Sequence, residues 1–269
     1  MKIVSARPAQ LILAVCVLAA SSASMAASTW NFSGNGVEGT NSGCGAAPSW
    51  GNTLVVKAGG SGACNGSGAV VTASAWASPT MTGNLATAQL TAYSGGIGIQ
   101  DLGDPLGSPD HSTDNAGYTD LVALDFGASK VALDQVSIGW YSTDADISVL
   151  AWTGAGAPAS LSTALNGKVN GGATGLVGNG WTLVGSYTDL QNGPATTNAS
   201  NITSSWWLIS AYNGSYPGGG AFSTGNDYLK ILTVSTKDLT KVPEPSSIAL
   251  AGLAMFGAFA ARRKTTNAA

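Results

Sequence analysis

The clearest pattern along the chain is a series of short runs in which hydrophobic residues alternate with polar or small ones. In residues 135–140, QVSIGW, every second residue is large and apolar. Successive side chains of a strand point to opposite faces, so this period of two places one face of the run on a core. The runs that we predict to be strands are residues 29–32, 53–57, 69–75, 86–93, 121–126, 135–140, 146–152, 181–187, 206–212 and 228–234.

Turn-forming residues separate these runs. Glycine-rich segments at 127–130, 154–158, 171–180 and 214–220 supply the backbone freedom that tight turns require. The chain has 37 glycines and only 9% charged residues, which argues against a helical or coiled-coil protein. Regularly spaced strands with such turns predict an all-β fold, an antiparallel β-sandwich or jelly roll.

The first 26 residues have the pattern of a secretory signal peptide. Lys2 and Arg7 precede an apolar run at 11–20, and Ser24 and Ala26 are small residues in front of the expected cleavage point. An uncleaved anchor is the alternative, but the apolar run is short for a membrane span. A lipoprotein attached through Cys16 is the weaker interpretation, because that cysteine lies inside the apolar run.

A second targeting pattern lies in residues 242–269. The sequence VPEP is followed by the uncharged run 246–261 and then by Arg262, Arg263 and Lys264. Sixteen residues span about 24 Å as a helix, slightly less than a hydrocarbon core of about 30 Å. We predict a transmembrane helix at 246–261, with the basic residues on the cytoplasmic side and the preceding chain outside the inner membrane.

This arrangement resembles the PEP-CTERM sorting signal of Gram-negative bacteria. The resemblance implies that an exosortase recognises Pro243, Glu244 and Pro245, that residues 262–264 stop transfer, and that the protein reaches the cell surface or extracellular matrix, often with exopolysaccharide. A permanent, unprocessed membrane anchor is the alternative. The expected organisation is a signal peptide at 1–26, an exported β-sandwich domain at 27–241 and a sorting signal at 242–269, with the general secretion machinery and the exosortase as partners.

Residues 118–152 carry a second, less specific likeness. The segments DLVALDF, VSIGW and DADISV, preceded by Asp-Asn at 114–115, resemble a block found in exosortase-dependent surface proteins. A looser pattern, completed by the strands at 181–184 and 228–231, is similar to discoidin-type jelly rolls. Neither resemblance implies a catalytic mechanism.

The charge of the middle of the chain excludes one class of partner. Residues 27–241 contain thirteen acidic and six basic residues, so their net charge is about −7. A nucleic-acid binder needs clustered Lys and Arg, and the six basic residues of this segment form no such cluster in the sequence. We expect an acidic exported domain that anionic membranes and nucleic acids repel.

Two cysteines remain once the signal peptide is removed. Cys44 and Cys64 lie twenty residues apart in a glycine-rich region, and exported proteins are exposed to oxidising conditions. We predict a disulfide between them, worth about 3 kcal/mol in the chain-entropy model. Free thiols or a metal pair are the alternatives.

The segment 101–115 concentrates acidic residues around the single histidine of the chain, His111. Its carboxylates belong to Asp101, Asp104, Asp110 and Asp114, and such a loop suits Ca²⁺, although the spacing matches no EF-hand. These four residues are therefore weak calcium candidates, and aspartate is also an ordinary turn residue. A catalytic role for His111 lacks a nucleophile motif, so we predict an exposed loop histidine.

Two further features carry weaker hypotheses. Asp144 and Asp146 could form a carboxylate pair for glycoside hydrolysis, but a solvated turn is the preferred interpretation. Trp206 and Trp207 are neighbours on a predicted strand and face opposite sides, so at least one should be exposed for glycan contact unless both faces are covered. The segment GNGVEG at 34–39 has dinucleotide-binding spacing without the helix that such binding requires.

Together these observations predict a secreted, exosortase-sorted surface or matrix protein with a structural or adhesive role and no catalytic site. A carbohydrate- or calcium-binding surface module is the alternative, and a secreted hydrolase is the third candidate.

Overall fold

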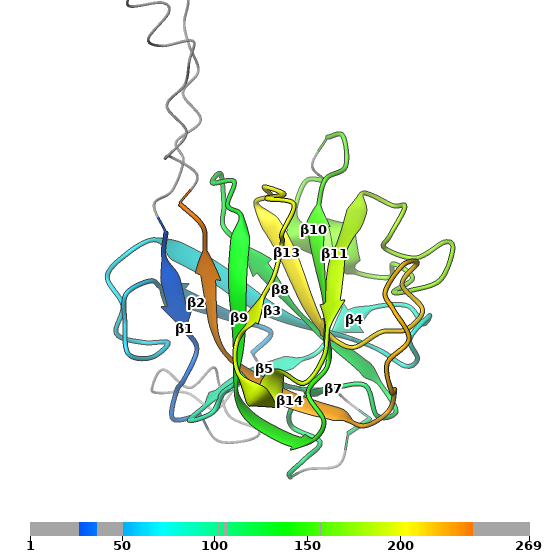
Figure 1. The fold of residues 1–269 in the computed structure, drawn as a ribbon, viewed down its shortest axis with the longest axis horizontal. Coiled ribbons are helices and arrows are strands. Elements are labelled where there is room, and N and C mark those ends of the chain that lie inside the picture. Colours follow the sequence, from blue (N-terminus) through cyan, green and yellow to red (C-terminus); the bar gives the residue numbers. More distant parts are fainter. Residues whose placement is uncertain (1–26, 37–50, 102, 105–106, 157, 239–269) are drawn as a thin grey trace, which may run out of the picture.

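The structure, a computed structural model, describes residues 27–36, 51–101, 103–104, 107–156 and 158–238. These residues form two antiparallel β-sheets, with a short helix α1 (Leu161–Leu165) and a 3₁₀ turn η1 (Leu190–Asn192). In Figure 1, β1, β9 and β14 of one sheet lie in front of β2 and β3 of the other, with loops at both ends. The predicted all-β, antiparallel class is confirmed, whereas the finer assignment to a β-sandwich or jelly roll stays a prediction.

The first sheet is organised around its long C-terminal strand, β14 (Asp227–Thr236). This strand pairs with β9 (Leu133–Thr143) along nearly its whole length, from Asp227 opposite Thr143 to Thr236 opposite Leu133. On its other side β14 pairs with β1 (Thr29–Asn31), β6 (Gly96–Gln100) and β7 (Thr113–Asp114). The sheet is completed by β12 (Ala195–Thr196) beside β9 and β5 (Gln89–Tyr93) beside β6.

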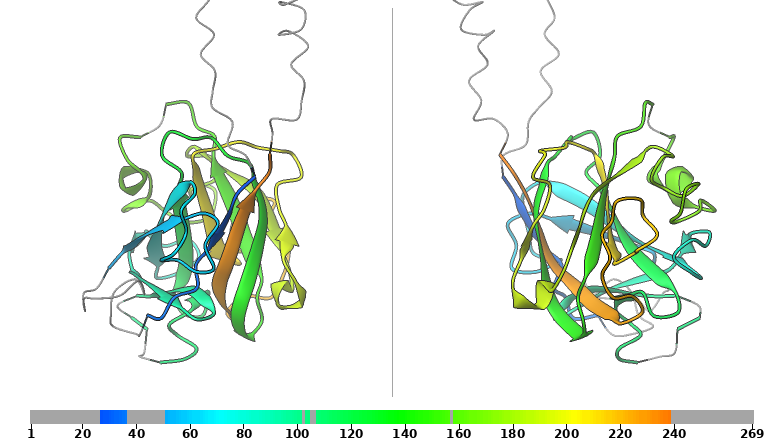
Figure 2. Two further views of the ribbon diagram at one scale, coloured as in Figure 1. Left: turned by 90° about the vertical axis from the view of Figure 1, so that its left-hand side faces the viewer. Right: turned by 45° about the vertical axis from the view of Figure 1, so that its right-hand side comes forward.

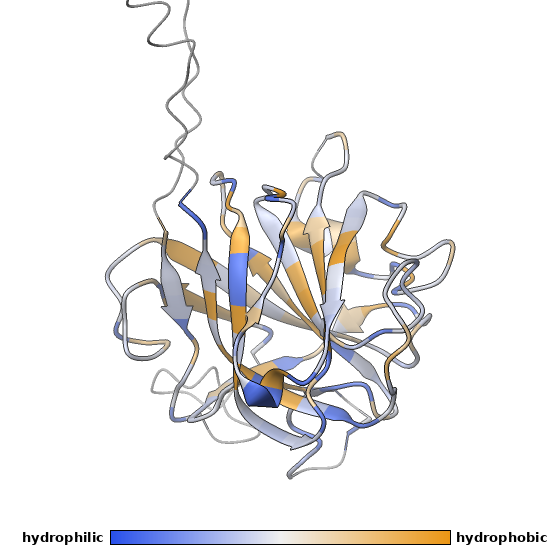
Figure 3. Ribbon diagram, in the orientation of Figure 1, coloured by the Kyte–Doolittle hydropathy of each residue, from blue (hydrophilic) through white to orange (hydrophobic). Residues whose placement is uncertain are grey.

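The second sheet holds most of the hydrophobic strands. Its order is β11 (Trp181–Tyr187), β10 (Ile147–Trp152), β13 (Trp206–Ala211), β8 (Thr119–Asp125), β3 (Val70–Ser78) and β2 (Thr53–Lys57), and β4 (Ala86–Thr87) pairs with β3. In Figure 3 hydrophobic colouring runs along these strands, whereas the connecting loops are mostly white or blue.

Both faces of the inner strands β8, β10 and β13 of the second sheet are buried, whereas the edge strand β2 has one exposed face. On β8, Val122 and Leu124 belong to a core shared with strands of the first sheet, whereas Leu121 and Ala123 belong to a second cluster that includes residues of α1. The right-hand view of Figure 2 shows α1 on the side of this sheet that faces away from the first. Because residues of α1 and its flanking loops pack on the outer face of the inner strands, these strands are buried on both sides like a central layer.

This covering layer explains the Trp206–Trp207 pair. Trp207 is completely buried in the shared core, where its indole N–H donates to the Ser204 carbonyl at 3.1 Å. Trp206 is 9% exposed and packs in the second cluster. Neither tryptophan presents an exposed face, because both sides of the strand are covered.

Most predicted strands are present, and three short strands were not predicted. The ranges predicted at 53–57 and 181–187 coincide with β2 and β11. The predicted strand at 86–93 is divided into β4 and β5. The sequence of β6, GIGIQ, does alternate isoleucine with glycine or glutamine, but glycine is a poor strand former and this strand was not predicted. The two-residue β7 and β12 are too short to carry a pattern. The prediction that residues 101–115 form only a loop is therefore wrong at β7.

The two ends of the described chain lie side by side. The Thr236 N–H donates to the Ser28 carbonyl at 3.0 Å, and the Ser28 N–H donates to the Thr236 hydroxyl at 3.2 Å. The predicted signal peptide at 1–26 and transmembrane helix at 246–261 lie outside the described residues. Within the ranges that the structure describes, no helix has the length and hydrophobicity to cross a membrane.

Candidate carboxylate sites

Two groups of carboxylates gather where β14 begins, at the end of the domain opposite Ser28 and Thr236. Strand pairing brings them together, because Asp227 lies opposite Thr143 and Tyr228 lies opposite Asp114. The first group consists of Asp104, Asp114 and Asp120, and the second of Asp144, Asp146 and Asp227. Within each group, the three carboxylate oxygens lie within 4.8 Å of one another.

The first group joins three segments of the chain. Asp120 is on β8 in the second sheet, Asp114 is on β7 in the first sheet, and Asp104 lies in the loop that precedes β7. Asp114 and Asp120 are 2% and 1% exposed, and Asp104 is half-buried. The neighbouring Asp101, 6% exposed, organises the loop by accepting hydrogen bonds from the backbone N–H groups of Gly103 and Asp104.

Each buried carboxylate of the first group is held by one oxygen. Asp114 accepts the Ala116 N–H at 3.0 Å through Oδ1, and Asp120 accepts the Asp114 N–H at 3.3 Å through Oδ2. The other oxygens, Oδ2 of Asp114 and Oδ1 of Asp120, are buried and accept no hydrogen bond. The same is true of Oδ2 of Asp101. Unsatisfied buried polar atoms are rare in proteins, so these three oxygens need an explanation.

The electrostatics of this group follow from burial and mutual repulsion. Burial, assisted by repulsion from neighbouring carboxylates, raises the pKa of Asp114 to about 8 and that of Asp104 to about 7. Burial also raises the pKa of Asp120 well above its ordinary value, reinforced by Asp114, Asp104 and Asp101. The three charged groups that act on Asp120 are all acidic.

The second group has a different hydrogen-bonding arrangement. Asp227 accepts the Asp146 N–H at 2.8 Å and the Asn115 side-chain amide at 2.5 Å, one on each oxygen. Asp146 accepts the Asp189 N–H at 2.9 Å. Asp144 accepts the Ala145 N–H at 2.8 Å through one oxygen, and the Ser223 hydroxyl and the Asn226 amide, both at 3.2 Å, through the other. Donors therefore surround these carboxylates.

The pKa values of the second group are also raised by burial. Asp227 is completely buried, and desolvation raises its pKa to about 7 against the opposing effect of its two hydrogen bonds. Desolvation raises the pKa of Asp146 in the same direction. Asn115 follows Asp114 of the first group in the chain, and its side chain contacts the second group. Its amide also donates to the Tyr212 carbonyl at 2.8 Å, and its Oδ1 accepts the N–H groups of Gly225 and Asp227.

The structure gathers some of the predicted calcium candidates and adds one. Asp104 and Asp114 are in the first group, Asp101 is adjacent, and Asp110 is half-buried and raises the pKa of both group members. Asp120 was not predicted, because it begins a hydrophobic strand and nothing in the sequence relates it to the loop.

His111 does not belong to either carboxylate group. It is half-buried and stacks on Tyr93, with ring centroids 4.7 Å apart and an interplanar angle of 22°. The Nζ of Lys230 lies over two aromatic rings, 4.7 Å from the ring centroid of Tyr93 and 3.9 Å from that of Trp140. His111, predicted to be an exposed loop histidine, is therefore half-buried and packed against an aromatic ring.

Asp144 and Asp146 are not in a solvated turn. Asp146 is 3% exposed and Asp144 is half-buried. Both carboxylates lie against that of Asp227, which is 81 residues after Asp146 in the chain. The prediction of a solvated turn is wrong because β14 and the 223–226 loop cover this corner. Asp227 was missed because it reads as the first residue of a strand.

Two pockets of about 420 and 410 Å³ lie on the second sheet around Trp152. Trp152 contacts Trp181 edge-on at 5.4 Å and Trp206 at 5.9 Å between ring centroids. The indole N–H groups of Trp152 and Trp181 are buried without an acceptor. Neither His111 nor the two carboxylate groups line these pockets.

The remaining predicted site residues, apart from Cys64, lie outside the residues that the structure describes. Cys64 lies in an exposed turn after β2, but Cys44 is outside the described residues, so the disulfide stays a prediction. The sorting residues Pro243, Glu244, Pro245, Arg262, Arg263 and Lys264 are likewise outside the described residues.

Comparison with known proteins concerns this last segment. Residues 241–264 match the family model of the PEP-CTERM protein-sorting motif. Searches of curated proteins and of solved structures gave no match to the chain. The motif implies export, sorting to the surface of a bacterial cell and an exosortase as the sorting partner. The chain is therefore a protein that carries the PEP-CTERM sorting motif.

Proposed function

We propose that this protein is a structural or adhesive component of the bacterial surface or extracellular matrix and that it catalyses no reaction. A signal peptide directs export, the segment 246–261 holds the precursor in the inner membrane, and an exosortase acts at Pro243–Glu244–Pro245. The PEP-CTERM match at residues 241–264 supports the surface location from which the proposal starts.

The geometry of the described domain supports this arrangement. The sorting motif begins five residues after Thr236, where β14 ends, and Ser28 lies beside Thr236. The two ends of the described chain therefore lie at one edge of the domain (Figures 1 and 2). Because β14 rises about 3.3 Å per residue, its first residue, Asp227, lies about 30 Å from that edge. In a tethered precursor, the carboxylate groups would face away from the membrane.

The role can be tested by complementation. Deletion of the gene should reduce cell aggregation or matrix retention, and the wild-type gene should restore it. Replacement of Pro243, Glu244 and Pro245 by alanine should prevent restoration because the protein is not sorted. His111→Ala and Asp144→Asn should restore the phenotype fully, since the proposal assigns no reaction to either residue. Failure of these two variants to complement, at normal surface abundance, would contradict a non-catalytic role.

A carbohydrate-binding surface is a second candidate, favoured by the pockets around Trp152. Tryptophan rings stack on sugar rings, and the half-buried Trp152 lines both pockets. Polar residues such as Thr163, Asn179 and Ser205 line the same pockets.

Affinity electrophoresis in gels containing the producing organism's own exopolysaccharide would test this candidate. Wild-type protein should migrate more slowly than in a plain gel, and Trp152→Ala should abolish the retardation. Trp140→Ala is the matched control, because Trp140 is another half-buried tryptophan, located on the first sheet away from both pockets. Equal retardation of both variants would refute binding at Trp152.

A further inference from the structure

The first carboxylate group lies where the two sheets meet. Along β8, Asp120 has the same orientation as Val122 and Leu124, which belong to the core between the sheets. Its cross-strand neighbour Ala77 belongs to the same core. The Asp120 carboxylate therefore ends this core, and it reaches the backbone of β7, a strand of the first sheet, through the Asp114 N–H.

The unpaired oxygens of this group are its most unusual feature. Asp114 and Asp120 are at least 98% buried, since 2% and 1% of each is exposed. Each has one oxygen fixed by a backbone N–H and a second oxygen, buried, with no hydrogen bond. The fixed oxygen orients the carboxylate, and the second oxygen is shielded from solvent and accepts from no protein donor. Burial of such an atom without a partner is strongly unfavourable.

The neighbouring negative charges add to the energetic cost of these unpaired oxygens. The charged groups that act on Asp114 are Asp104, Asp110 and Asp101, and all of them are acidic. The second carboxylate group shows that this chain can satisfy buried acids with its own donors, because both oxygens of Asp227 accept N–H groups. The first group lacks such donors at Oδ2 of Asp114 and Oδ1 of Asp120. A bound cation would satisfy these oxygens and neutralise the repulsion.

The donor set selects the kind of cation. The group offers carboxylate oxygens only, which suit hard cations, whereas Zn²⁺ in proteins prefers nitrogen and sulfur ligands. Calcium is coordinated by oxygen at about 2.3–2.6 Å, so two ligands on opposite sides of one ion lie at most about 5 Å apart. The oxygens of Asp104, Asp114 and Asp120, within 4.8 Å of one another, can therefore share one ion.

We propose that Asp104, Asp114 and Asp120 bind one Ca²⁺ ion, which joins the two sheets at the end of the domain far from the chain termini. Asp101 positions the loop that supplies Asp104. This assignment goes beyond the proposed surface role and does not depend on it. Extracellular modules bind calcium with dissociation constants of about 10⁻⁴–10⁻³ M, and we expect a Kd in this range.

The binding can be measured directly with CaCl₂. The full chain, purified and stripped with EDTA, is titrated by isothermal titration calorimetry and followed by thermal unfolding. We expect one Ca²⁺ per chain and, at a calcium concentration about 100 times Kd, a Tm increase on the order of 5–10 °C. Asp120→Asn and Asp114→Asn should raise Kd at least about 10-fold, whereas Asp144→Asn, the matched control in the second group, should leave it within about twofold.

Stability in EDTA separates this proposal from simple damage to the fold. Asp120→Asn removes a repelled negative charge while keeping the side-chain size, so its Tm in EDTA should equal or exceed that of the wild type and should no longer respond to calcium. The proposal is overturned if the wild type shows no calcium response, or if Asp120→Asn responds like the wild type. It is also overturned if Asp144→Asn abolishes binding while Asp120→Asn retains it, because the ion would then belong to the second group.

Discussion

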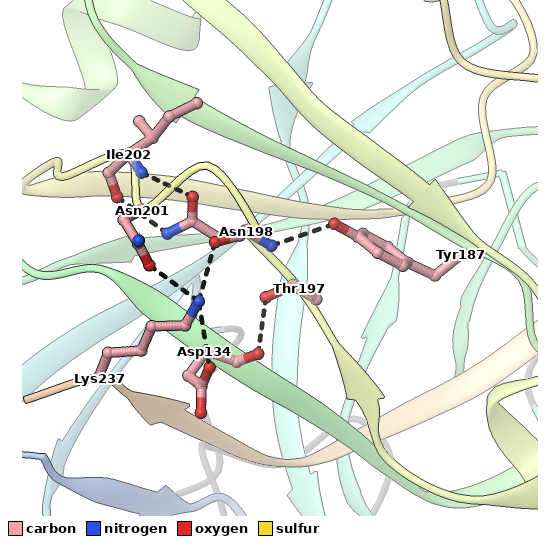
Figure 4. A network of polar contacts seen from close by, with 7 residues as sticks. All are labelled: Asp134, Tyr187, Thr197, Asn198, Asn201, Ile202 and Lys237. Atoms are coloured by element: carbon pink, nitrogen blue, oxygen red, sulfur yellow. Dashed lines mark hydrogen bonds and ion pairs between the residues drawn. The ribbon is translucent and has the colours of Figure 1, made fainter.

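Replacement of Asn198 by alanine should destabilise the protein more than its position in a loop suggests. Figure 4 shows the network around this residue, which joins the segment after β12 to β9, β11 and the end of β14. Asn198 is completely buried, and its amide makes two hydrogen bonds to Ile202, donating to the carbonyl at 2.9 Å and accepting the N–H at 2.7 Å. Its own carbonyl accepts from Lys237 Nζ at 3.0 Å.

The magnitude follows from these contacts and from the backbone. Loss of two hydrogen bonds to partly buried groups costs about 1 kcal/mol each. Asn198 has a φ of 55°, and alanine in this left-handed conformation costs about 1 kcal/mol more than asparagine. We therefore expect Asn198→Ala to lower the free energy of unfolding by about 2–4 kcal/mol, or the Tm by about 5–12 °C.

Asn201 provides a matched control for the backbone contribution. Its φ of 53° is nearly the same, but it is exposed and its side chain contacts Lys237 Nζ at 3.0 Å instead of a loop backbone group. Asn201→Ala should therefore cost only about 1 kcal/mol. The assay is equilibrium unfolding of the purified variants in urea. Equal destabilisation by the two substitutions, within about 0.5 kcal/mol, would show that the Asn198–Ile202 pair contributes nothing, and would refute the reasoning.

Three further predictions concern pH, the core and the cysteines. Because burial raises the folded-state pKa of Asp227 to about 7, folding favours the protonated form of this side chain. Its contribution to the free energy of unfolding is present at low pH and is lost as the pH rises through about 7. Tm measured from about pH 5 to about pH 8 should therefore fall less steeply for Asp227→Asn than for the wild type, and an equal slope would contradict this. Trp207→Ala should cost about 3–5 kcal/mol in urea unfolding, whereas Val55→Ala, 58% exposed in the wild type, should cost less than about 1 kcal/mol; similar values would argue against the core as described. Alkylation followed by mass spectrometry should modify Cys44 and Cys64 only after reduction, and labelling of both without a reductant would exclude the disulfide.

The strands were predictable where local pattern and tertiary environment agree. The range of β11 coincides with its alternating sequence at 181–187, and β2 coincides with 53–57. The short β7 could not be predicted, because its two residues lie among turn-forming residues and are held by pairing with β14, more than a hundred residues away in the sequence. The burial of Trp206 depends on a covering segment that has no strand periodicity of its own.

The carboxylate groups illustrate the same limit at the level of a site. The sequence indicated that Asp101, Asp104, Asp110 and Asp114 could act together, because they are close along the chain. It could not relate Asp120 to them, or Asp227 to Asp144 and Asp146, because these contacts form only when the two sheets meet. Local composition therefore identified the acidic region, and strand register determined which carboxylates share a site.

The most direct test of the account is the mass and location of the protein in cells that contain the exosortase and in cells that lack it. The account predicts a surface or matrix form in which residues 242–269, about 3 kDa of the 26.7 kDa chain, are largely removed near Pro243–Glu244–Pro245, and only where the exosortase is present. In cells without the enzyme, the protein should keep this segment and stay in the inner membrane. An intact segment with membrane retention in both strains would contradict sorting by an exosortase.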